Sequence, residues 1–286
     1  MRILITGGSG YLGTRLADFL RKQKHEVSTL SNDKKAKLNV DISNFAELKK
    51  AVKGFDMVFH LAALIDTKQS FERPMEYFYV NSVGTLNVLE AARVNDVKRI
   101  LLTSSVKVYG KPAYLPYDEK HPTVPISPYG YSKLAAEEFC RSYGSAYSLS
   151  ITIARLANIY GPNQSSNLFI PTVLSQLDKD KIMLRNLSSK RDYIYVDDVI
   201  SALNTCLEKG VNDVFNFGSG KSYSVKEILD IISKLVGKKL NVEVNESSKT
   251  VEADEEVADI RKAKSVLGWQ PKVSMEEGLK RILESR

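Results

Sequence analysis

The sequence predicts an α/β fold in which a doubly wound parallel sheet is joined to a smaller C-terminal α/β lobe. Two observations predict this fold. Over the first 160 residues, short apolar runs of strand length alternate with segments of helical periodicity, as in a parallel sheet with helices on both faces. From about residue 161 this alternation becomes less regular.

The predicted elements follow in order along the chain. Apolar runs predict strands at residues 3–5, 26–30, 56–60, 98–103, 150–156, 192–195 and 214–217. Apolar residues at helical spacing predict helices from about residue 12 and at 44–52, 74–94, 129–143, 168–178, 196–208, 224–236 and 274–284. Ser43 or Asn44 suits the cap of the second helix, and Pro74 suits the first turn of the third.

A Pro-rich loop at residues 111–128 lies between the fourth strand and the next helix. It is too long for a simple connection between elements, so we interpret it as a functional lid.

Composition indicates a globular protein that binds small anions. Of 286 residues, 43% are apolar and 26% are charged, which allows a large core. The net charge is +7, but Lys and Arg are spread along the chain and mixed with acids, apart from a short cluster at Lys34, Lys35 and Lys37. This pattern favours anionic small molecules over nucleic acid as partners.

Cysteine usage and hydropathy indicate the compartment. Cys140 and Cys206 lie in helical patterns without metal-ligand spacing, so we expect neither a metal site nor a disulfide framework. No apolar run is long enough to span a membrane, and the N-terminal run is a strand and not a signal peptide. We therefore expect a cytoplasmic protein.

A glycine-rich turn follows the first strand. Gly7, Gly10 and Gly13 lie between the apolar run 3–5 and a helix, at the spacing Gly-x-x-Gly-x-x-Gly. Such a turn directs the first backbone N–H groups of the helix and its dipole at an anion, typically a phosphate. Gly7 permits the tight turn, Gly10 lets a pyrophosphate approach the backbone, and Gly13 lets the helix pack against the strand. The motif predicts dinucleotide binding.

Five stretches with potential chemistry end predicted parallel strands. Because the carboxyl ends of parallel strands meet at one edge of the sheet, we expect these stretches to converge on one crevice. They are Gly7–Gly13, Ser31, Ala62–Ala63, Ser104–Ser105 and Ala157–Asn158.

Tyr129 and Lys133 lie four residues apart at the start of a predicted helix, so their side chains share one face. A tyrosine hydroxyl has a pKa near 10, and a neighbouring ammonium favours the phenolate. Lowering this pKa by roughly three units needs about 4 kcal/mol, which an adjacent cation and a nicotinamide charge could supply. Ser105 could bind the reacting oxygen, whereas Tyr131 faces away from Lys133.

The chain resembles the extended short-chain dehydrogenase/reductase superfamily, and within it the nucleotide-sugar epimerase/dehydratase group that includes UDP-glucose 4-epimerases. The resemblance runs nearly end to end. It rests on the residues of the glycine turn, 6–13, and on motifs at residues 60–63, 81–85, 104–110, 127–133, 158–162, 191–198 and 267–271.

The resemblance implies a role for each matching residue. Ser105, Tyr129 and Lys133 would be catalytic, with Tyr129 as base and acid, and Lys133 would also bind the nicotinamide ribose. The implied cofactor residues are Gly7, Gly10, Tyr11, Leu12, Gly13, Ser31, Asn32, Asp41, Ile42, Leu61, Ala62, Ala63, Asn81, Lys133 and Leu156. The implied substrate residues are Ser105, Tyr129, Asn158, Asn167, Leu168 and Arg191, and Arg191 suits a pyrophosphate because guanidinium groups pair with phosphate oxygens.

The resemblance also implies a Rossmann nucleotide-binding domain at residues 1–160, to which a segment near 192–217 returns. Residues 161–191 and 218–286 would form the nucleotide-sugar-binding lobe. The helices at 74–94 and 129–143 resemble the pair that forms a dimer interface in relatives, so we expect a homodimer.

Several residues depart from the family pattern. NAD-preferring relatives usually end the second strand with Asp or Glu, whereas this chain has Ser31 followed by Asn32. Lys34 or Lys35 could pair with a 2′-phosphate, so NAD is expected and NADP stays open.

Two other departures concern the substrate. The acidic pair that follows the catalytic Ser or Thr in dehydratases is replaced by Val106 and Lys107, which disfavours 4,6-dehydration. Where relatives often carry a second phosphate-binding Arg, this chain has Asp254, Glu255 and Glu256.

We therefore expect an NAD-dependent epimerase that acts on a nucleotide-activated hexose through a transient 4-keto sugar. An NADPH-dependent reductase of nucleotide 4-keto-6-deoxy sugars is the alternative enzyme, motivated by Ser31 and the lysine-rich loop. A non-catalytic dinucleotide sensor is the alternative of another class.

Overall fold

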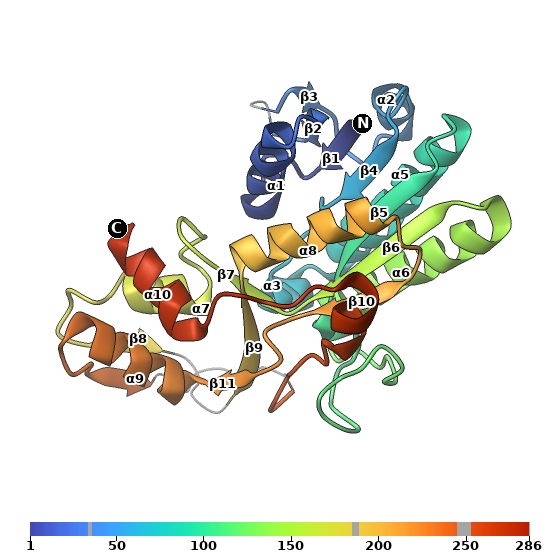
Figure 1. The fold of residues 1–286 in the computed structure, drawn as a ribbon. Coiled ribbons are helices and arrows are strands. Elements are labelled where there is room, and N and C mark those ends of the chain that lie inside the picture. The colour runs from blue at the N-terminus through green and yellow to red at the C-terminus, as the bar shows by residue number, and fades with distance from the viewer. Residues whose placement is uncertain (34–35, 185–188, 245–252, 286) are drawn as a thin grey trace.

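The computed structural model describes residues 1–286 except 34–35, 185–188, 245–252 and 286. Its larger part is built on a seven-stranded parallel sheet with the order β10-β6-β5-β4-β1-β2-β3 (Figure 1). The strands are β1 (Arg2–Thr6), β2 (Glu26–Ser31), β3 (Leu38–Asn39), β4 (Met57–His60), β5 (Arg99–Ser105), β6 (Ser150–Leu156) and β10 (Val214–Phe217). The strand order reverses beside β1, and this is where open parallel sheets bind ligands.

Helices cover both faces of this sheet because its strands are apolar on both sides. Ile3 and Ile5 point to one face, and Leu4 between them points to the other. The first face is covered by α1 (Tyr11–Lys22), α8 (Val196–Lys209) and a π-helical turn at Ala263–Leu267. The second face is covered by α2 (Phe45–Ala51), α5 (Gly84–Val94) and α6 (Pro128–Tyr147).

The smaller part of the molecule has its own apolar core (Figure 1). A three-stranded sheet has the order β11-β9-β7, and β12 pairs with β8 in a second sheet. These strands are β7 (Asn158–Tyr160), β8 (Ile182–Leu184), β9 (Lys190–Tyr195), β11 (Ser222–Ser224) and β12 (Val242–Val244). The helices are α7 (Phe169–Leu174), α9 (Val225–Val236) and α10 (Met275–Glu284).

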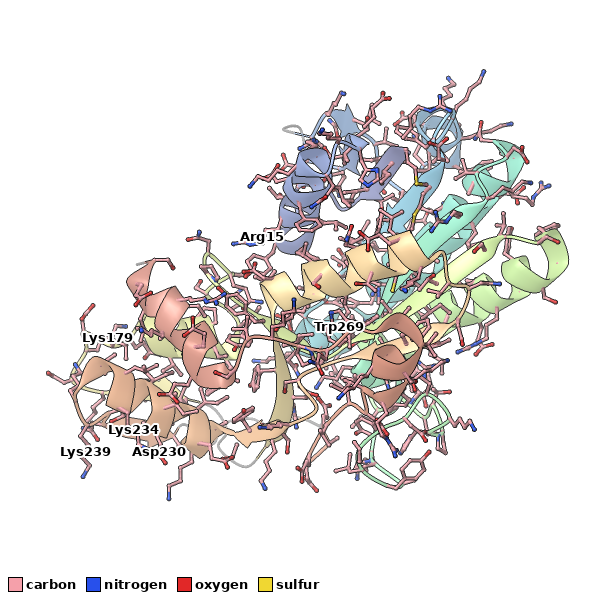
Figure 2. The ribbon with its side chains drawn as sticks, viewed as in Figure 1. Arg15, Lys179, Asp230, Lys234, Lys239 and Trp269 are labelled. Carbon is pink, nitrogen blue, oxygen red and sulfur yellow. The ribbon has the colours of Figure 1, made fainter. Side chains whose placement is uncertain are left out.

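Residues 258–269 return from the smaller part to the large sheet before the chain ends in α10. Trp269 is buried and packs edge-on against Phe217 of β10, with the ring centroids 5.0 Å apart (Figure 2). Arg15 of α1 lies over the Tyr11 ring and donates to the Pro162 carbonyl, which follows β7 (Figure 2). Such contacts hold the two parts of the chain together.

The predicted fold class is confirmed, with local differences. The expected helix at 74–94 is α4 (Pro74–Tyr77), a π-helical turn at Phe78–Val83, and α5. Polar side chains bond at this change in winding: the Thr85 hydroxyl donates to the Asn81 carbonyl, and the Ser82 hydroxyl donates to the Ser132 carbonyl of α6.

The prediction missed the short elements. The strands β3, β7, β8, β11 and β12 have only two or three residues each, too few to show a period of two. It also missed α3 (Thr67–Glu72), which begins where the Asp66 carboxylate accepts from the Gln69 N–H. It ended α6 early at residue 143 and α7 late at residue 178.

The loop at 111–128 is hydrogen-bonded to residues 257–259, so it is not the open lid that the sequence predicts. Tyr117 is fully buried and stacks on Tyr109 at 4.7 Å. The Tyr117 N–H donates to the Val257 carbonyl, and the Tyr117 carbonyl accepts from the Asp259 N–H.

Among the described residues, no helix is long and apolar enough to cross a membrane. Cys140 and Cys206 are both buried and form no disulfide.

Candidate active site

The glycine turn between β1 and α1 is packed too closely for side chains. Gly7 has φ +70°, and a Cβ there would lie 2.7 Å from the Ala62 backbone nitrogen. A Cβ at Gly13 would lie 2.2 Å from the Gly7 carbonyl oxygen. Both positions therefore require glycine for the turn itself.

Gly10 differs, because a Cβ there would meet only the Gly7 carbonyl oxygen, at 3.1 Å. Gly10 is the N-cap of α1, and no described side chain caps this helix end. The first-turn N–H groups and the open face at Gly10 suit a pyrophosphate, which needs backbone donors and close approach. The turn therefore fits a dinucleotide cofactor.

Gly10→Ala tests this fit. The methyl group would lie 3.1 Å from the Gly7 carbonyl oxygen, so a shift of a few tenths of an ångström accommodates it, and it projects where the pyrophosphate approaches. We expect NAD affinity to fall about tenfold or more, while the melting temperature of the cofactor-free protein stays near that of the wild type. Calorimetric titration with NAD and thermal melts measure the two quantities. Wild-type affinity in this variant would exclude cofactor binding at the turn.

A buried histidine, which the sequence analysis did not single out, supports the turn. His60 Nδ1 lies 2.7 Å from Thr6 Oγ1, and its Nε2 lies 2.9 Å from Thr85 Oγ1. Because the Thr85 hydroxyl donates to the Asn81 carbonyl, it accepts from Nε2–H, and Nδ1 accepts from Thr6. Burial, aided by the charge of Lys133, lowers the His60 pKa to about 3, so the ring stays neutral.

The end of β2 carries hydroxyl groups in place of a carboxylate. Ser31 is buried, and its Oγ lies 2.7 Å from Ser9 Oγ and accepts from the Asp33 N–H. Asn32 is exposed. Lys34 and Lys35, to which the sequence analysis gave a role with a 2′-phosphate, lie outside the described residues.

Most of the other predicted cofactor residues lie at the same edge of the sheet. Leu61, Ala62 and Ala63 follow β4, Leu156 ends β6, and Asp41 and Ile42 follow β3. Asn81 is 1% exposed, and its amide group bonds the Leu64 N–H, the Leu64 carbonyl and Ser132 Oγ. In this structure its side chain holds the loop after β4 against α6.

Ser105 and Tyr129 come together where β5 ends and α6 begins, and Lys133 lies one turn further along α6. Tyr129 and Lys133 occupy the sheet-facing side of α6, 8% and 4% exposed, while Tyr131 points outward at 47%. The Tyr129 hydroxyl forms a hydrogen bond with Ser105. The helix begins at the right place because the Ser127 hydroxyl caps it by accepting from the Gly130 N–H.

The protein groups alone do not lower the pKa of Tyr129, so the expected lowering depends on the nicotinamide charge as well. Burial raises the pKa of Tyr129 to about 12, and the hydrogen bond from Ser105 opposes this rise. Burial also lowers the pKa of Lys133 to about 8, against the attraction of the Glu137 carboxylate. The expectation missed that both groups lose solvation together.

A buried ion pair lies behind Lys133 and was also missed by the sequence analysis. Glu137, one helical turn after Lys133, is fully buried and accepts from Arg155 Nη2 at 2.6 Å and from the Ser104 hydroxyl at 2.6 Å. This network ties α6 to β5 and β6. The four-residue spacing from Lys133 to Glu137 is the signal that could have found it.

The structure does not bring the predicted substrate residues together as closely as Ser105 and Tyr129. Arg191 is 5% exposed and donates to the carbonyls of Lys190 and Ala253. The Asn158 amide donates to the Asp192 carbonyl at 3.0 Å. Asn167 is exposed, and Leu168 is the N-cap of α7.

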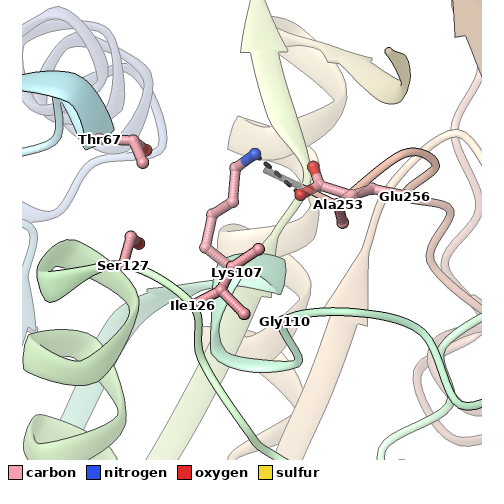
Figure 3. A pocket seen from close by; sticks show the side chains of 7 residues that line it. All are labelled: Thr67, Lys107, Gly110, Ile126, Ser127, Ala253 and Glu256. Atoms are coloured by element: carbon pink, nitrogen blue, oxygen red, sulfur yellow. Dashed lines mark hydrogen bonds and ion pairs between the residues drawn. The ribbon is translucent and has the colours of Figure 1, made fainter. Parts of the chain in front are cut away.

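A pocket lies beside the catalytic residues, where the two parts of the chain meet (Figure 3). It is lined by Thr67, Lys107, Gly110, Ile126, Ser127, Ala253 and Glu256. Lys107 Nζ lies 2.8 Å from Glu256 Oε1, and Arg191 Nε lies 3.4 Å from Glu256 Oε2. In the sequence Lys107 and Glu256 stand out only as departures from the family pattern, because nothing in it pairs residues so far apart.

Comparisons with known proteins agree with this site. Residues 3–218 match the model of the NAD dependent epimerase/dehydratase family. The UDP-glucose 4-epimerase of Mycolicibacterium smegmatis is 32% identical, over 99% of this chain and 98% of that protein.

Two solved structures are similar over nearly the whole chain. The UDP-glucose 4-epimerase of Thermotoga maritima with UDP-glucose has a TM-score of 0.92 and 30% identity, covering 99% of this chain and 98% of that one. The UDP-glucuronic acid 4-epimerase of Bacillus cereus, in complex with UDP-glucuronic acid and NAD, has a TM-score of 0.90 and 26% identity, covering 100% of both chains.

Proposed function

Because this chain belongs to the NAD dependent epimerase/dehydratase family, we infer that it is an NAD-dependent epimerase of a nucleotide-activated hexose. The reaction passes through a transient 4-keto sugar. The observation that supports this inference is the contact of the Tyr129 hydroxyl with Ser105, with Lys133 buried one helical turn after Tyr129 on the same helix. Val106 and Lys107 follow Ser105, so the chain supplies no acid at these two positions for dehydration.

We assign the proton transfers to Tyr129. As a phenolate, Tyr129 takes the proton of the sugar 4-hydroxyl when the 4-keto sugar forms, and as a phenol it returns the proton when the sugar is reduced from the other face. When bound, oxidised NAD supplies a reversible hydride acceptor and a positive charge. This charge and protonated Lys133 favour the phenolate against the burial that raises the pKa of Tyr129 to about 12.

Ser105 and Lys133 position the reacting groups. The Ser105 hydroxyl bonds Tyr129 and can share the reacting oxygen of the sugar, while its Oγ accepts from the Lys107 N–H at 3.2 Å. Lys133 holds the nicotinamide ribose through its ammonium donors.

The pyrophosphate is assigned to Arg191, with Asn158, Asn167 and Leu168 lining the rest of the nucleotide path. This assignment is supported by the planar fork of a buried guanidinium, which pairs with phosphate oxygens. Residues 1–160 with 192–217 form the proposed dinucleotide-binding domain, and residues 161–191 and 218–286 form the proposed nucleotide-sugar lobe.

Turnover without added cofactor tests this function. The purified enzyme is incubated with UDP-glucose, UDP-N-acetylglucosamine and GDP- or dTDP-hexoses, and the products are separated by chromatography. We expect conversion of one of these to its 4-epimer. Absence of turnover unless NADPH is supplied would contradict the self-contained redox cycle.

A second function, reduction of a 4-keto-6-deoxy nucleotide sugar by NADPH, is favoured by one observation. The hydroxyl pair of Ser9 and Ser31 places no carboxylate where the adenosine ribose of a dinucleotide binds. Steady consumption of NADPH with such a keto sugar would support this function, whereas NAD retained through purification would argue against it.

We also propose a homodimer. Large apolar side chains are exposed on the α4–α5 segment and on α6, among them Met75 at 79%, Tyr79 at 54% and Tyr131 at 47%. Neighbouring helices with such side chains suit an isologous contact with a second copy.

Met75→Glu tests the dimer, since a charge in an apolar contact is costly when desolvated. Light scattering is expected to give twice the chain mass of 32.0 kDa for the wild type, and the chain mass itself for the variant. Met183→Glu is the control, because Met183 is 44% exposed on β8, in the other part of the molecule. A monomeric wild type would remove the proposal.

A further inference from the structure

The pocket that holds Lys107 and Glu256 adjoins the proposed reaction centre. Lys107 lies two residues after Ser105, and its N–H donates to the Ser105 hydroxyl oxygen. Ser127, which also lines the pocket, caps the helix that carries Tyr129. Figure 3 shows the Lys107 side chain extending from its turn into the pocket toward Glu256, with Ser127 and Thr67 across from it.

Glu256 is placed in this pocket by backbone pairing. The Glu256 N–H donates to the Lys190 carbonyl, and the Lys190 N–H donates to the Asp254 carbonyl. The segment therefore runs along β9, and the Glu256 carboxylate projects between Lys107 and Arg191. The side chains of Glu256, Arg191 and Lys107 are only 4%, 7% and 15% exposed.

The pocket has hydrogen-bonding capacity that the described residues do not use. Glu256 Oε2 is buried and receives no hydrogen bond from any described group, although Arg191 Nε lies 3.4 Å away. Lys107 has three ammonium hydrogens, and among the described residues its side chain donates one hydrogen bond, to Glu256 Oε1. A buried acceptor without a donor is costly, so a ligand that donates to it is favoured.

We propose that Lys107 and Glu256 form a subsite that selects a neutral hexose, with a hydroxymethyl group at C5, over the matching hexuronate. This inference rests on the proposed epimerase function. A hydroxyl group both donates and accepts, so it can donate to Glu256 and accept from Lys107. A carboxylate can only accept, and it faces the Glu256 charge in a nearly dry pocket.

The positive charge of Arg191 does not reverse this preference. Under the proposed function Arg191 pairs with the pyrophosphate. The Lys107 ammonium already pairs with Glu256 Oε1, so the group left open toward the sugar is the Glu256 Oε2 oxygen, which carries negative charge. Because the epimerised carbon is C4, the C5 substituent lies within a few bonds of the reaction centre, and like charge acts over that range at low dielectric.

The wild-type enzyme gives the first test. We expect kcat/KM for UDP-glucose to exceed that for UDP-glucuronate by about 100-fold, since like charge brought together in an interface costs several kcal/mol. Equal or greater efficiency with UDP-glucuronate would overturn the subsite and leave the epimerase function standing. Turnover of no nucleotide sugar at all would overturn the epimerase function, and the subsite with it.

Glu256→Gln gives the second test. The amide keeps the shape but removes the negative charge, so the preference for UDP-glucose over UDP-glucuronate is expected to fall at least about tenfold, mainly through better use of UDP-glucuronate. Glu255→Gln is the matched control on the same segment, because the Glu255 carboxylate bonds the Ser222 hydroxyl and not Lys107. An unchanged preference in Glu256→Gln, or an equal change in Glu255→Gln, would overturn the assignment.

Discussion

Replacing Tyr129 with Phe is expected to lower the turnover number for epimerisation about 10³-fold, within the range for loss of a general acid–base group. The substitution removes only the hydroxyl, which bonds Ser105. The ring keeps its packing, including the edge-on contact with Tyr77 at 6.4 Å between centroids. Steady-state kinetics with the accepted nucleotide sugar measure the loss.

Tyr131→Phe is the matched control for this variant. It removes the same atom from the same helix, but Tyr131 is 47% exposed and faces away from the sheet. Its turnover number is expected to stay within about twofold of the wild type, in line with the small effects of surface changes. Wild-type turnover in Tyr129→Phe would show that another group moves the proton. It would also restore the alternative that the fold serves as a non-catalytic dinucleotide sensor.

Replacing Lys133 with Met is expected to lower turnover about 100-fold and to weaken NAD retention through purification. Methionine fills much of the same volume but supplies neither a positive charge for Tyr129 nor donors for a ribose. Kinetics and the ratio of absorbance at 260 and 280 nm measure the two effects. Full activity with bound NAD would remove Lys133 from the catalytic set.

The same variant is expected to be more stable than the wild type when both lack cofactor at pH 7. Burial lowers the pKa of Lys133 from 10.5 to about 8 in the folded protein, so the unfolded chain binds more protons between these values. Burial of the Lys133 ammonium therefore lowers the free energy of unfolding of the wild type by about 3 kcal/mol below pH 8, and this penalty vanishes above pH 10.5. Urea unfolding at pH 7 and pH 10.5 should show a higher free energy of unfolding for Lys133→Met than for the wild type only at the lower pH.

Higher stability with lower activity would separate a catalytic role from simple damage to the fold. Glu137 keeps its partners in this variant, because Arg155 and Arg141 both donate to its carboxylate. A Lys133→Met protein that is less stable than the wild type at pH 7 would instead mean that the lysine serves the packing of α6.

The large sheet could be predicted because each strand is buried on both faces and therefore appears as an apolar run. The runs at 150–156 and 214–217 match β6 and β10 residue for residue. The smaller part was harder to predict from sequence. Strands such as β8 and β12 are stabilised by pairing with each other, although they lie far apart in the chain. The irregular winding at 78–83 depends on polar contacts with residues near 132 and could not be read from local periodicity.

The site, too, has residues that the sequence predicts and residues that only the folded structure shows. Ser105, Tyr129 and Lys133 follow from motifs and from helical spacing, since one helix turn brings two of them to one face. The pair of Lys107 and Glu256 joins residues 149 positions apart, and only the folded chain brings them together. The raised pKa of Tyr129 also depends on burial, which the sequence does not give directly.

The proposed epimerisation requires that hydrogen leaves C4 of the sugar and returns to the same carbon within one active site that contains NAD and Tyr129. The most direct measurement follows deuterium at C4 of the accepted nucleotide sugar, in ordinary water and without added cofactor. We expect mass spectrometry and NMR to find the label retained at C4 of the epimer. Replacement of the label by solvent hydrogen would rule out this internal hydrogen transfer.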